Sequence, residues 1–428
     1  YSFWNIMGDE IYWHDHSISE GEAYQLPGVF LYEPEQPVVL VEHMDVQVID
    51  FQNLFSNYRF NNAAAFGGSE YMRFNYQDAA TIENILADPA HPLNDNIEMV
   101  ISRPFGNDAD GNEVFTSRIA GGEYRDLSTL GITETDYQPA FQPGGNFYGL
   151  PLAVGAHLVL YYNSALMAAT PVPATTDELL ALDAGNPPAG TAGWLGMLEN
   201  SRYWYMPWLN GFGGALFDAG GNATLDTPEM VSTLTFAKEL VDSGLIPDDP
   251  LGAEFLTYDN AQEMFRNGEL PMHINGPWAV EYLRSGAVGA NLRAAVIPAV
   301  SATMQPAQAW YDTFNIYIRD NGDPSTEQAY ADMLLTTLTE ASIEAVYTFE
   351  TEIWQAVQLP GLLAAQDLPN VTDQLTLDIM AALPADNPQP YGGVMNDIWP
   401  AVGMYFEDVI RGTMTPADAA AAMQADIP

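Results

Sequence analysis

Strand-like and helix-like segments alternate along most of this chain, and this alternation limits the folds open to it. Apolar or β-branched runs that suit strands occur at 38–50, 98–102, 147–163 and 270–275. Segments with helical periodicity occur at 53–65, 227–243, 327–338 and 342–349, and the tail 399–427 suits two helices. Strands that alternate with helices usually pair in parallel, because the helices form the crossovers. The pattern therefore predicts an α/β fold with mostly parallel sheets.

The chain is long for one domain, since its 428 residues exceed the usual range of about 100–200 residues. No Pro- or Ser-rich linker, tandem repeat or low-complexity segment divides the sequence. We therefore expect two α/β lobes woven together by several crossovers, rather than two domains in series.

The chain is strongly acidic, with 57 Asp and Glu against 12 Lys and Arg and a formal net charge of −45. A negative field of this size repels phosphate backbones, which argues against nucleic acid as a partner. It also disfavours anionic lipid surfaces and strongly anionic ligands. The acidic surface either serves solubility or attracts a cation or polyamine, and the charge leaves both interpretations open.

Several chemical classes are excluded by what the sequence lacks. It has no cysteine, which excludes disulfides, thiolate zinc sites, iron–sulfur clusters and cysteine nucleophiles. It has no dinucleotide fingerprint, P-loop, zinc-protease or serine-hydrolase motif, so we expect no cofactor and nominate no catalytic residue. No apolar run reaches the roughly 18–20 residues of a membrane helix. The start at Tyr1 has no signal-peptide pattern, which predicts a mature or trimmed chain.

Two polar loops have some features of metal sites. His14 and His16 stand two residues apart, which suits two ligands on an extended segment, but no third ligand follows at a suitable spacing. The loop 106–113 places Asp108 and Asp110 before a glycine, as calcium loops do, but lacks a glutamate at the last position of an EF-hand. We expect ordinary polar turns at both places and assign no metal ligand.

Aromatic residues gather at the ends of predicted elements. Tyr203 and Trp204 open an aromatic, glycine-rich segment, and Trp278 follows an Asn-Gly-Pro turn. Trp310 precedes a strand, and Trp399 opens a helix. In a ligand cleft, flat rings meet sugar C–H faces, while indole N–H and phenol O–H groups meet hydroxyls. The set predicts such a cleft, although core packing explains each ring alone equally well.

Longer stretches around these rings resemble the maltose/maltodextrin-type extracellular solute-binding proteins of ABC importers, solute-binding family 1. The most specific is AQEMFRNGELPMHINGPW at 261–278, which is similar to the family's helix followed by F-x-x-G-x-x-A-M-x-I-N-G-x-W, with Pro271 in place of alanine. Further stretches that resemble family segments are FYGLPLAVGAHLVLYYN at 147–163, SRYWYMPWLNGFGGALF at 201–217 and the C-terminal tryptophan helix with its tail at 395–424. The resemblance covers about 126–428, and the N-terminal third matches less well.

The resemblance implies a type II, periplasmic-binding-protein-like fold with a multi-crossover hinge. The N-terminal lobe would hold 1–153 and 300–345, and the C-terminal lobe 158–297 and 350–428, with crossovers near 153–158, 298–303 and 340–355. A sugar or oligosaccharide would bind between the lobes, and hinge closure would trap it. The closed form would be recognised by an ABC permease in the membrane. The implied location is extracellular, at the cell surface or in the periplasm, with a lipid anchor that is not in this chain.

The resemblance also assigns aromatic contacts, residue by residue. Trp278 and Trp399 match the family's sugar-stacking tryptophans, and Tyr203 matches a sugar-contacting tyrosine. Trp204 and Trp310 join them in the expected site because they belong to the same clusters of rings.

Polar contacts are assigned in the same way. Asp9 or Glu10 matches a hydroxyl-binding acid near the family's first turn. Gly155 stands where a family glutamate often contacts sugar, with His157 nearby, and Ser201 replaces a second glutamate. Fewer acids in the cleft would alter the choice of sugar.

Three other functions are also compatible with the sequence. A glycoside-acting enzyme would need two carboxylates about 5–9.5 Å apart across the cleft, and the sequence singles out no such pair among its 57 acids. A surface or assembly protein that reuses the fold would explain the unusual segment 11–37. A polyamine or cation receptor would suit the charge, but it would need a cleft lined by acids rather than by tryptophans.

Overall fold

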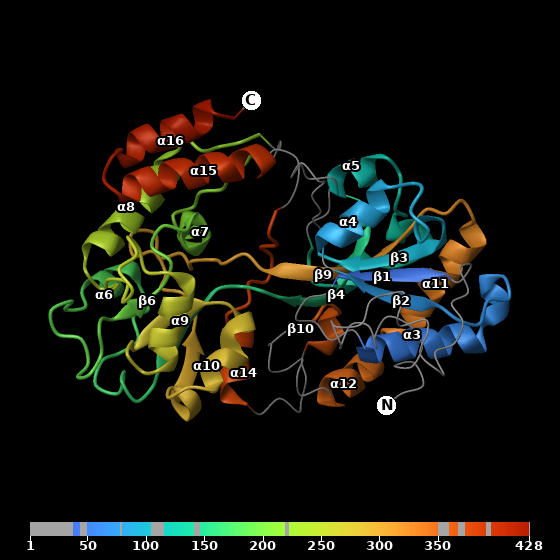
Figure 1. Ribbon diagram of the computed structural model, residues 1–428, viewed down its shortest axis with the longest axis horizontal. Coiled ribbons are helices and arrows are strands. Elements are labelled where there is room, and N and C mark those ends of the chain that lie inside the picture. The colour runs from blue at the N-terminus through green and yellow to red at the C-terminus, as the bar shows by residue number, and fades with distance from the viewer. Residues whose placement is uncertain are drawn as a thin grey trace. The chain divides into compact units, whose positions relative to one another are not determined.

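The structure of the protein is a computed structural model. It describes residues 37–42, 49–77, 79–103, 115–140, 146–218, 222–349, 359–366, 373–390 and 395–427. The described residues form two compact units, each built on its own sheet (Figure 1). Unit 1 holds the described residues up to Val154 together with 313–349 and 359–366, and unit 2 holds 155–312, 373–390 and 395–427. The predicted α/β class, with two lobes joined by several crossovers, is confirmed.

Unit 1 is built on a six-stranded sheet in the order β10-β4-β9-β3-β1-β2. Its strands are β1 (Val38–Glu42), β2 (Arg73–Gln77), β3 (Ile97–Ser102), β4 (Gly149–Gly155), β9 (Asp312–Ile318) and β10 (Leu359–Pro360). The strand β1 pairs in parallel with β2 and β3, whereas β9 runs antiparallel to β3. The parallel pairs are those whose strands are connected through helices, as a parallel crossover requires.

Helices cover both faces of this sheet. The described helices of unit 1 are α3 (Ile49–Asn61), α4 (Ala79–Ala87), α5 (Phe115–Ala120), α11 (Pro324–Thr337) and α12 (Glu340–Phe349). Figure 1 shows α4 and α5 on one side of the sheet and α3 and α12 on the other. All five residues of β1 are therefore buried. The predicted strand at 38–50 is too long, because Ile49 already begins α3 and helix formation there overrides the β-branched pattern.

Unit 2 is built on a four-stranded sheet in the order β6-β7-β5-β8. Its strands are β5 (Val159–Asn163), β6 (Leu195–Gly196), β7 (Met272–Asn275) and β8 (Leu292–Ala295). The strand β5 runs antiparallel to both of its neighbours, and only β6 and β7 pair in parallel. The expectation of mostly parallel sheets is therefore wrong for unit 2. Alternation along the sequence fixes the kinds of element, but not the direction in which a strand enters a sheet.

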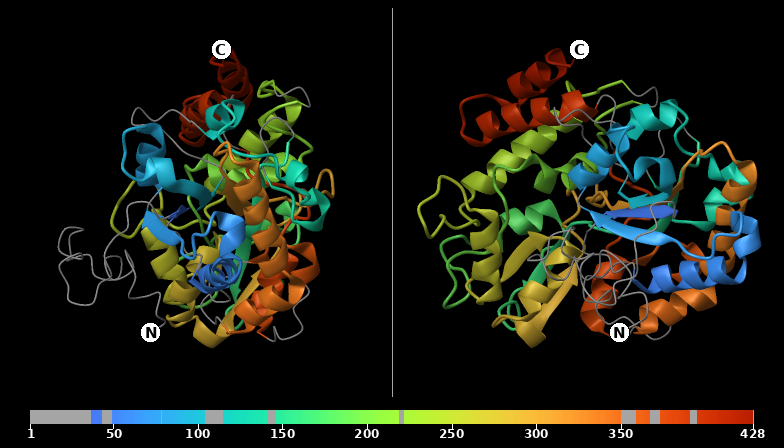
Figure 2. Two further views of the ribbon diagram at one scale, coloured as in Figure 1. Left: turned by 90° about the vertical axis from the view of Figure 1, so that its right-hand side faces the viewer. Right: turned by 45° about the vertical axis from the view of Figure 1, so that its right-hand side comes forward.

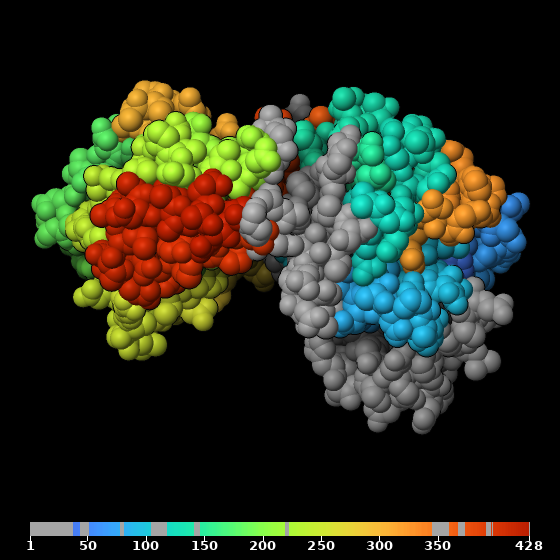
Figure 3. All heavy atoms as spheres, turned by 90° about the horizontal axis from the view of Figure 1, so that it is seen from above, coloured from blue at the N-terminus to red at the C-terminus, as the bar shows by residue number. Residues whose placement is uncertain are grey.

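The helices of unit 2 surround this sheet and carry the candidate site. Its described helices are α6 (Thr176–Leu180), α7 (Arg202–Gly211), α8 (Pro228–Asp242), α9 (Tyr258–Arg266), α10 (Val280–Arg284), α14 (Gln374–Ala381), α15 (Met395–Ile410) and α16 (Pro416–Ala425). The last two lie side by side in the views of Figures 1 and 2. Figure 3 shows them exposed on one face of unit 2, in red.

The helix α8 begins and ends where the sequence predicts. The side chain of Thr227 accepts a hydrogen bond from the Met230 backbone N–H at 3.2 Å, and Pro228 occupies the first turn. Gly244 follows the helix in the left-handed conformation, with φ of 70°. Thr257 starts α9 in the same way, by accepting from the backbone N–H of Asn260. Local capping therefore sets the position of Tyr258, the first residue of α9.

Residues 300–312, which the sequence placed in the N-terminal lobe, lie in unit 2. Val300, Ala307, Ala309 and Trp310 are buried in the core of that unit. The return of the chain to unit 1 comes between Asp312 and Thr313, at the start of β9. The difference arises because residues 300–312 pack their apolar side chains against α7 and its neighbours rather than continuing directly into a strand. Residues 359–366, which the sequence placed in the C-terminal lobe, lie instead in unit 1, where β10 pairs with β4.

No helix in the described part of the chain combines the length and the hydropathy that crossing a lipid bilayer requires.

Candidate functional site

Aromatic rings from distant segments lie next to one another across unit 2. We call these six residues the aromatic row: Trp278, Tyr258, Trp204, Tyr203, Trp310 and Trp399. At one end, the Trp278 indole Nε1–H donates to the Tyr258 hydroxyl at 2.8 Å. Ring centroids then follow at 6.2 Å from Tyr258 to Trp204, 5.4 Å from Trp204 to Tyr203, 6.4 Å from Tyr203 to Trp310 and 5.7 Å from Trp310 to Trp399. These spacings are typical of aromatic pairs in contact.

The row combines rigid anchors with rings that remain accessible. Trp204 and Trp310 are buried, with 9% and 8% of their surfaces exposed. Trp278, Trp399 and Tyr203 are only partly buried, as is Tyr258. Partly exposed rings that lie beside buried ones offer apolar area that a bound ligand can cover.

The polar groups of Trp204 and Tyr203 already have hydrogen-bond partners. The Trp204 indole N–H donates to the Ile274 carbonyl oxygen at 2.9 Å, and the Tyr203 hydroxyl donates to the Ala156 carbonyl oxygen at 3.2 Å. By contrast, the indole nitrogens of Trp310 and Trp399 have no hydrogen-bond partner among the described residues. These two N–H groups are therefore available to donate to a ligand.

Trp278 is held by the turn that follows β7. The Asn275 side-chain amide donates to the His273 ring Nε2 at 2.9 Å, while its oxygen accepts from the Gly276 backbone N–H at 2.8 Å. His273 therefore carries its proton on Nδ1 and donates it to the Gly196 carbonyl oxygen at 2.8 Å. Burial lowers the pKa of His273 to about 4, which keeps the ring neutral near pH 7.

A glycine is required at position 276 because the Trp278 ring folds back over it. A Cβ atom at Gly276 would lie 1.9 Å from Cζ3 of that ring, so any larger residue would displace the indole. The Asn-Gly-Pro-Trp sequence that marks the resemblance thus has a physical explanation. The hydrogen bonds of the Asn275 side chain fix the end of β7, and the absence of a side chain at Gly276 leaves space for the Trp278 ring.

The Trp399 ring is covered by an arginine that the sequence did not nominate. The guanidinium carbon of Arg202 lies 4.2 Å from the Trp399 ring centroid. Trp399 belongs to α15 and Arg202 is the first residue of α7, so the contact joins two helices that are far apart in the sequence.

The structure brings together five of the eight residues predicted for the site: Trp278, Trp399, Tyr203, Trp204 and Trp310. His157 does not join the row. It is 1% exposed, its Nε2 lies 2.9 Å from the Ile379 carbonyl oxygen, and burial lowers its pKa to about 4. Asp9 and Glu10 lie outside the described residues.

The two loops considered for metal binding, at 14–16 and 106–113, also lie outside the described residues. Among the residues that the structure does describe, no three His, Asp or Glu side chains come together to hold a metal ion.

Two residues of the site, Tyr258 and Arg202, were missed in the sequence. Tyr258 stands directly after a capping threonine and three residues before the family-like stretch. Arg202 is one of only 12 basic residues in the chain and falls inside the aromatic segment. A basic residue inside an aromatic segment of so acidic a chain is the sequence feature that indicates Arg202 as a candidate site residue.

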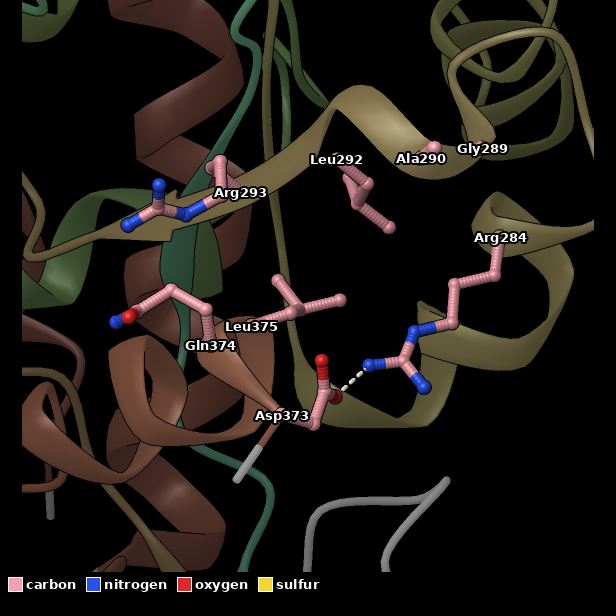
Figure 4. Close-up of a pocket in the computed structure, with 8 residues that line it drawn as sticks. All are labelled: Arg284, Gly289, Ala290, Leu292, Arg293, Asp373, Gln374 and Leu375. Atoms are coloured by element: carbon pink, nitrogen blue, oxygen red, sulfur yellow. Dashed lines mark hydrogen bonds and ion pairs between the residues drawn. The ribbon is translucent and has the colours of Figure 1, made fainter. Parts of the chain in front are cut away.

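Unit 2 also contains two open hollows. One, of about 430 Å³, is lined by residues that include Tyr258, Phe255, Glu407 and Arg411, so it adjoins the aromatic row at Tyr258. The other, of about 380 Å³, is lined by Arg284, Gly289, Ala290, Leu292, Arg293, Asp373, Gln374 and Leu375 (Figure 4). Figure 4 shows Arg284 reaching towards Asp373, which pairs with it.

Comparisons with known proteins agree with this architecture. The family model for bacterial extracellular solute-binding proteins matches residues 77–375, which is well over half of the chain. The chain therefore belongs to this family, as the sequence motifs predicted. A stretch of 164 residues is 27% identical to proteins of Brucella abortus (strain 2308) and Brucella suis biovar 1 (strain 1330) whose names mention binding but no ligand. That match covers 36% of this chain and 38% of each relative.

Three solved structures share the fold over almost their whole length. The GacH receptor of Streptomyces glaucescens GLA.O, described unliganded and with acarbose, has a TM-score of 0.65 at 20% identity, over 91% of this chain and 97% of that one. The maltotriose-bound MalE domain of Bdellovibrio bacteriovorus has a TM-score of 0.62 at 18% identity, over 92% of this chain and 98% of that one. A cyclo/maltodextrin-binding protein complexed with maltotetraose has a TM-score of 0.69 at 18% identity, over 93% of this chain and 97% of that one. At these identities the comparison establishes the fold.

Proposed function

We propose that this protein is the substrate-binding receptor of an ABC importer and that it binds a sugar or oligosaccharide, of maltodextrin type in its general shape, on the aromatic row. The observation that carries the proposal is the row itself. Its partly exposed rings, Trp278, Tyr203, Tyr258 and Trp399, offer flat apolar faces, and the free indole N–H groups of Trp310 and Trp399 offer hydrogen bonds. This combination matches the two kinds of surface that a pyranose ring presents.

Family membership and the fold support the same proposal. The family consists of bacterial extracellular solute-binding proteins, and the three solved structures are of proteins in complex with acarbose, maltotriose and maltotetraose. An extracellular or periplasmic location, an ABC permease as partner and closure of the two lobes around the ligand belong to the proposal. Closure would release binding energy only if the ligand gains more contacts in the closed form than in the open form.

A polyamine or cation receptor is less well supported. Such a site would place carboxylates beside its rings, so that they neutralise the ammonium groups of the ligand. The aromatic row instead has a guanidinium, that of Arg202, against Trp399. We therefore attribute the net negative charge of the chain to its exposed surface rather than to the ligand site.

Isothermal titration calorimetry with parallel tryptophan fluorescence tests the proposal. The panel would contain maltose, longer maltodextrins, trehalose, other neutral disaccharides, uronate disaccharides, monosaccharides and spermidine. Saturable binding of one sugar class is expected, and Trp278→Ala or Trp399→Ala should weaken it at least ~30-fold, as for a central aromatic contact. Phe60→Ala, which removes a 52% exposed ring from unit 1, is the matched control and should bind as the wild type does.

Three results would contradict the proposal. These are binding of spermidine but of no sugar, sugar binding that survives both tryptophan substitutions, and conversion of the sugar into products on prolonged incubation.

A further inference from the structure

Basic side chains are scarce in this chain, and almost all of them are paired with carboxylates. Ten of the 12 Lys and Arg residues lie within ion-pair distance of an Asp or Glu. They are Arg59, Arg103, Arg118, Arg125, Lys238, Arg266, Arg284, Arg293, Arg319 and Arg411. Arg202 differs from these ten, because it has neither a carboxylate at that distance nor a hydrogen-bond partner among the described residues.

The Arg202 guanidinium occupies a slot on α15 formed by Trp399 and Gly403. Residues four apart in a helix lie on one face, so the indole and the glycine stand next to each other. The guanidinium carbon is 4.2 Å from the ring centroid, and a Cβ at Gly403 would lie only 2.4 Å from Nη1. The glycine therefore makes room for the guanidinium beside the ring.

This placement leaves a partly buried positive charge without a carboxylate at ion-pair distance among the described residues. The Nε atom is buried and has no partner, and burial lowers the pKa of Arg202. The neighbouring acid, Glu407, is already engaged by Arg411 at 2.8 Å and by the Asn200 amide at 3.3 Å. A partly buried charge without a direct ion-pair partner is costly, and an anion from outside the protein would reduce that cost.

The hollow of Figure 4 provides a contrast within the same unit. It also presents two arginines, but Arg284 is paired with Asp373 and Arg293 with Asp378. Asp373, directly before α14, and Asp378, within it, thus neutralise that surface, and an anion gains little there. At Arg202 no described carboxylate lies within ion-pair distance, although the chain contains 57 Asp and Glu residues.

We propose that Arg202 receives an anionic group of the ligand, so that the aromatic row takes an acidic sugar, one that carries a carboxylate, sulfate or phosphate. This inference rests on the proposed function, because it assigns the class of sugar to the same site. A guanidinium presents paired N–H donors that match the oxygens of such groups. Stacking on the Trp399 ring fixes the orientation of the guanidinium, and the neighbouring rings contact the apolar faces of the sugar ring.

The negative charge of the whole protein does not prevent this binding. Charges on the exposed surface are screened beyond about 8–10 Å near physiological ionic strength, whereas a direct contact with a partly buried guanidinium is screened much less. The negative field of the whole protein lowers the association rate of an anion, whereas the direct contact with Arg202 determines its dissociation rate and affinity.

Calorimetry on the full chain at about 150 mM salt tests the inference with matched ligands. Uronate disaccharides built from galacturonate, glucuronate, mannuronate and guluronate are compared with their neutral counterparts. Sulfated and phosphorylated disaccharides form separate arms that identify the anionic group. The wild type should bind at least one acidic sugar ~10-fold or more tightly than its neutral counterpart, as expected for hydrogen bonds to a charged group.

Substitutions then separate a charge contact from simple packing on Trp399. Arg202→Gln should weaken binding of the acidic sugar ~10-fold or more and change binding of a neutral sugar less than ~3-fold. Gly403→Ala, which displaces the guanidinium but keeps its charge, should act in the same direction. Arg284→Gln removes the same charge from the hollow of Figure 4 and should leave both affinities unchanged. Thermal melting checks that each variant is folded.

The outcomes distinguish this inference from the proposed function. If neutral sugars bind as tightly as the acidic ones, or if Arg202→Gln weakens both equally, the inference is wrong and the sugar-receptor proposal stands. If Arg284→Gln abolishes the preference instead, the anion binds at the other hollow and the inference is wrong. If no sugar of either kind binds, both proposals fail together.

Discussion

The two units of this protein use their polar and aromatic side chains in opposite ways. Unit 1 buries charges: Arg118 and Glu83 are each 7% exposed and joined at 2.9 Å, and Arg59 is 1% exposed beside Glu98. The ion pairs of unit 2 lie nearer the surface, as Arg266 and Glu263 do on α9. Unit 2 instead leaves several aromatic rings partly exposed and one guanidinium, that of Arg202, without an ion-pair partner among the described residues.

This difference separates structural residues from residues available to a ligand. A buried ion pair consumes the hydrogen-bonding capacity of both partners, so neither side chain can serve a ligand without destabilising the fold. A partly exposed ring loses little by being covered later. The binding surface of unit 2 is therefore expected to tolerate substitutions that the buried charges of unit 1 do not.

The largest expected effect concerns the buried pair of unit 1. Arg118→Met leaves the Glu83 carboxylate buried without its guanidinium and should lower the free energy of unfolding by about 3–5 kcal/mol. Arg266→Met breaks an exposed pair in unit 2 and should cost no more than about 1 kcal/mol. Urea unfolding measures both. Equal losses for the two variants would contradict the contrast between the units.

The next effect is a loss of stability in acid that originates in unit 2. Burial lowers the pKa values of His157 and His273 to about 4, from 6.5 in an exposed histidine. Between these values the unfolded chain binds protons that the folded chain does not, so stability falls as the pH drops from 6.5 towards 4. Each histidine contributes up to about 3 kcal/mol to this fall.

Unfolding free energies at pH 7.5, 6.0 and 4.5 measure this dependence. His157→Gln and His273→Gln should each flatten it, and an unchanged slope in both variants would disprove the assignment. Because His273 supports Asn275 and the Trp278 turn, His273→Gln should also weaken sugar binding, whereas His157→Gln should not.

A smaller effect is expected from the glycine beneath Trp278. Gly276→Ala places a Cβ where the indole ring lies, so the ring must move, and sugar affinity should fall ~10-fold with little loss of stability. Gly185→Ala, where the nearest atom to the new Cβ is 3.4 Å away, is the control and should have no effect. Unchanged affinity in Gly276→Ala would mean that Trp278 does not contact the ligand.

The smallest effect concerns the hydroxyl that orients Trp278. Tyr258→Phe keeps the ring but removes the acceptor of the Trp278 indole N–H, a hydrogen bond worth about 1 kcal/mol. Sugar affinity measured by calorimetry should fall about 3–5-fold. A loss as large as that of Trp278→Ala would indicate that Tyr258 itself is a main contact with the sugar.

The sequence predicted the parts of this account that depend on local chemistry. The helix from Thr227 to Gly244 and the turn that places Trp278 follow from caps and glycines, which act over a few residues. The direction of β5 and the packing of 300–312 in unit 2 could not be predicted, because they depend on contacts between distant segments. For the same reason Arg202 was missed, since only the packing of α7 on α15 brings it to Trp399, whereas His157 was expected at the site and is buried elsewhere.

The most direct test of the sugar site is ¹⁹F NMR of the protein labelled with 5-fluorotryptophan. The chain has nine tryptophans, and single substitutions assign their resonances. Titration with the sugar that binds best in calorimetry should shift the resonances of Trp278 and Trp399 with the same dissociation constant. Trp194 and Trp208, buried in the core of unit 2, should stay unshifted. Saturable binding that leaves the resonances of Trp278 and Trp399 unmoved would contradict the assignment of the aromatic row as the sugar site.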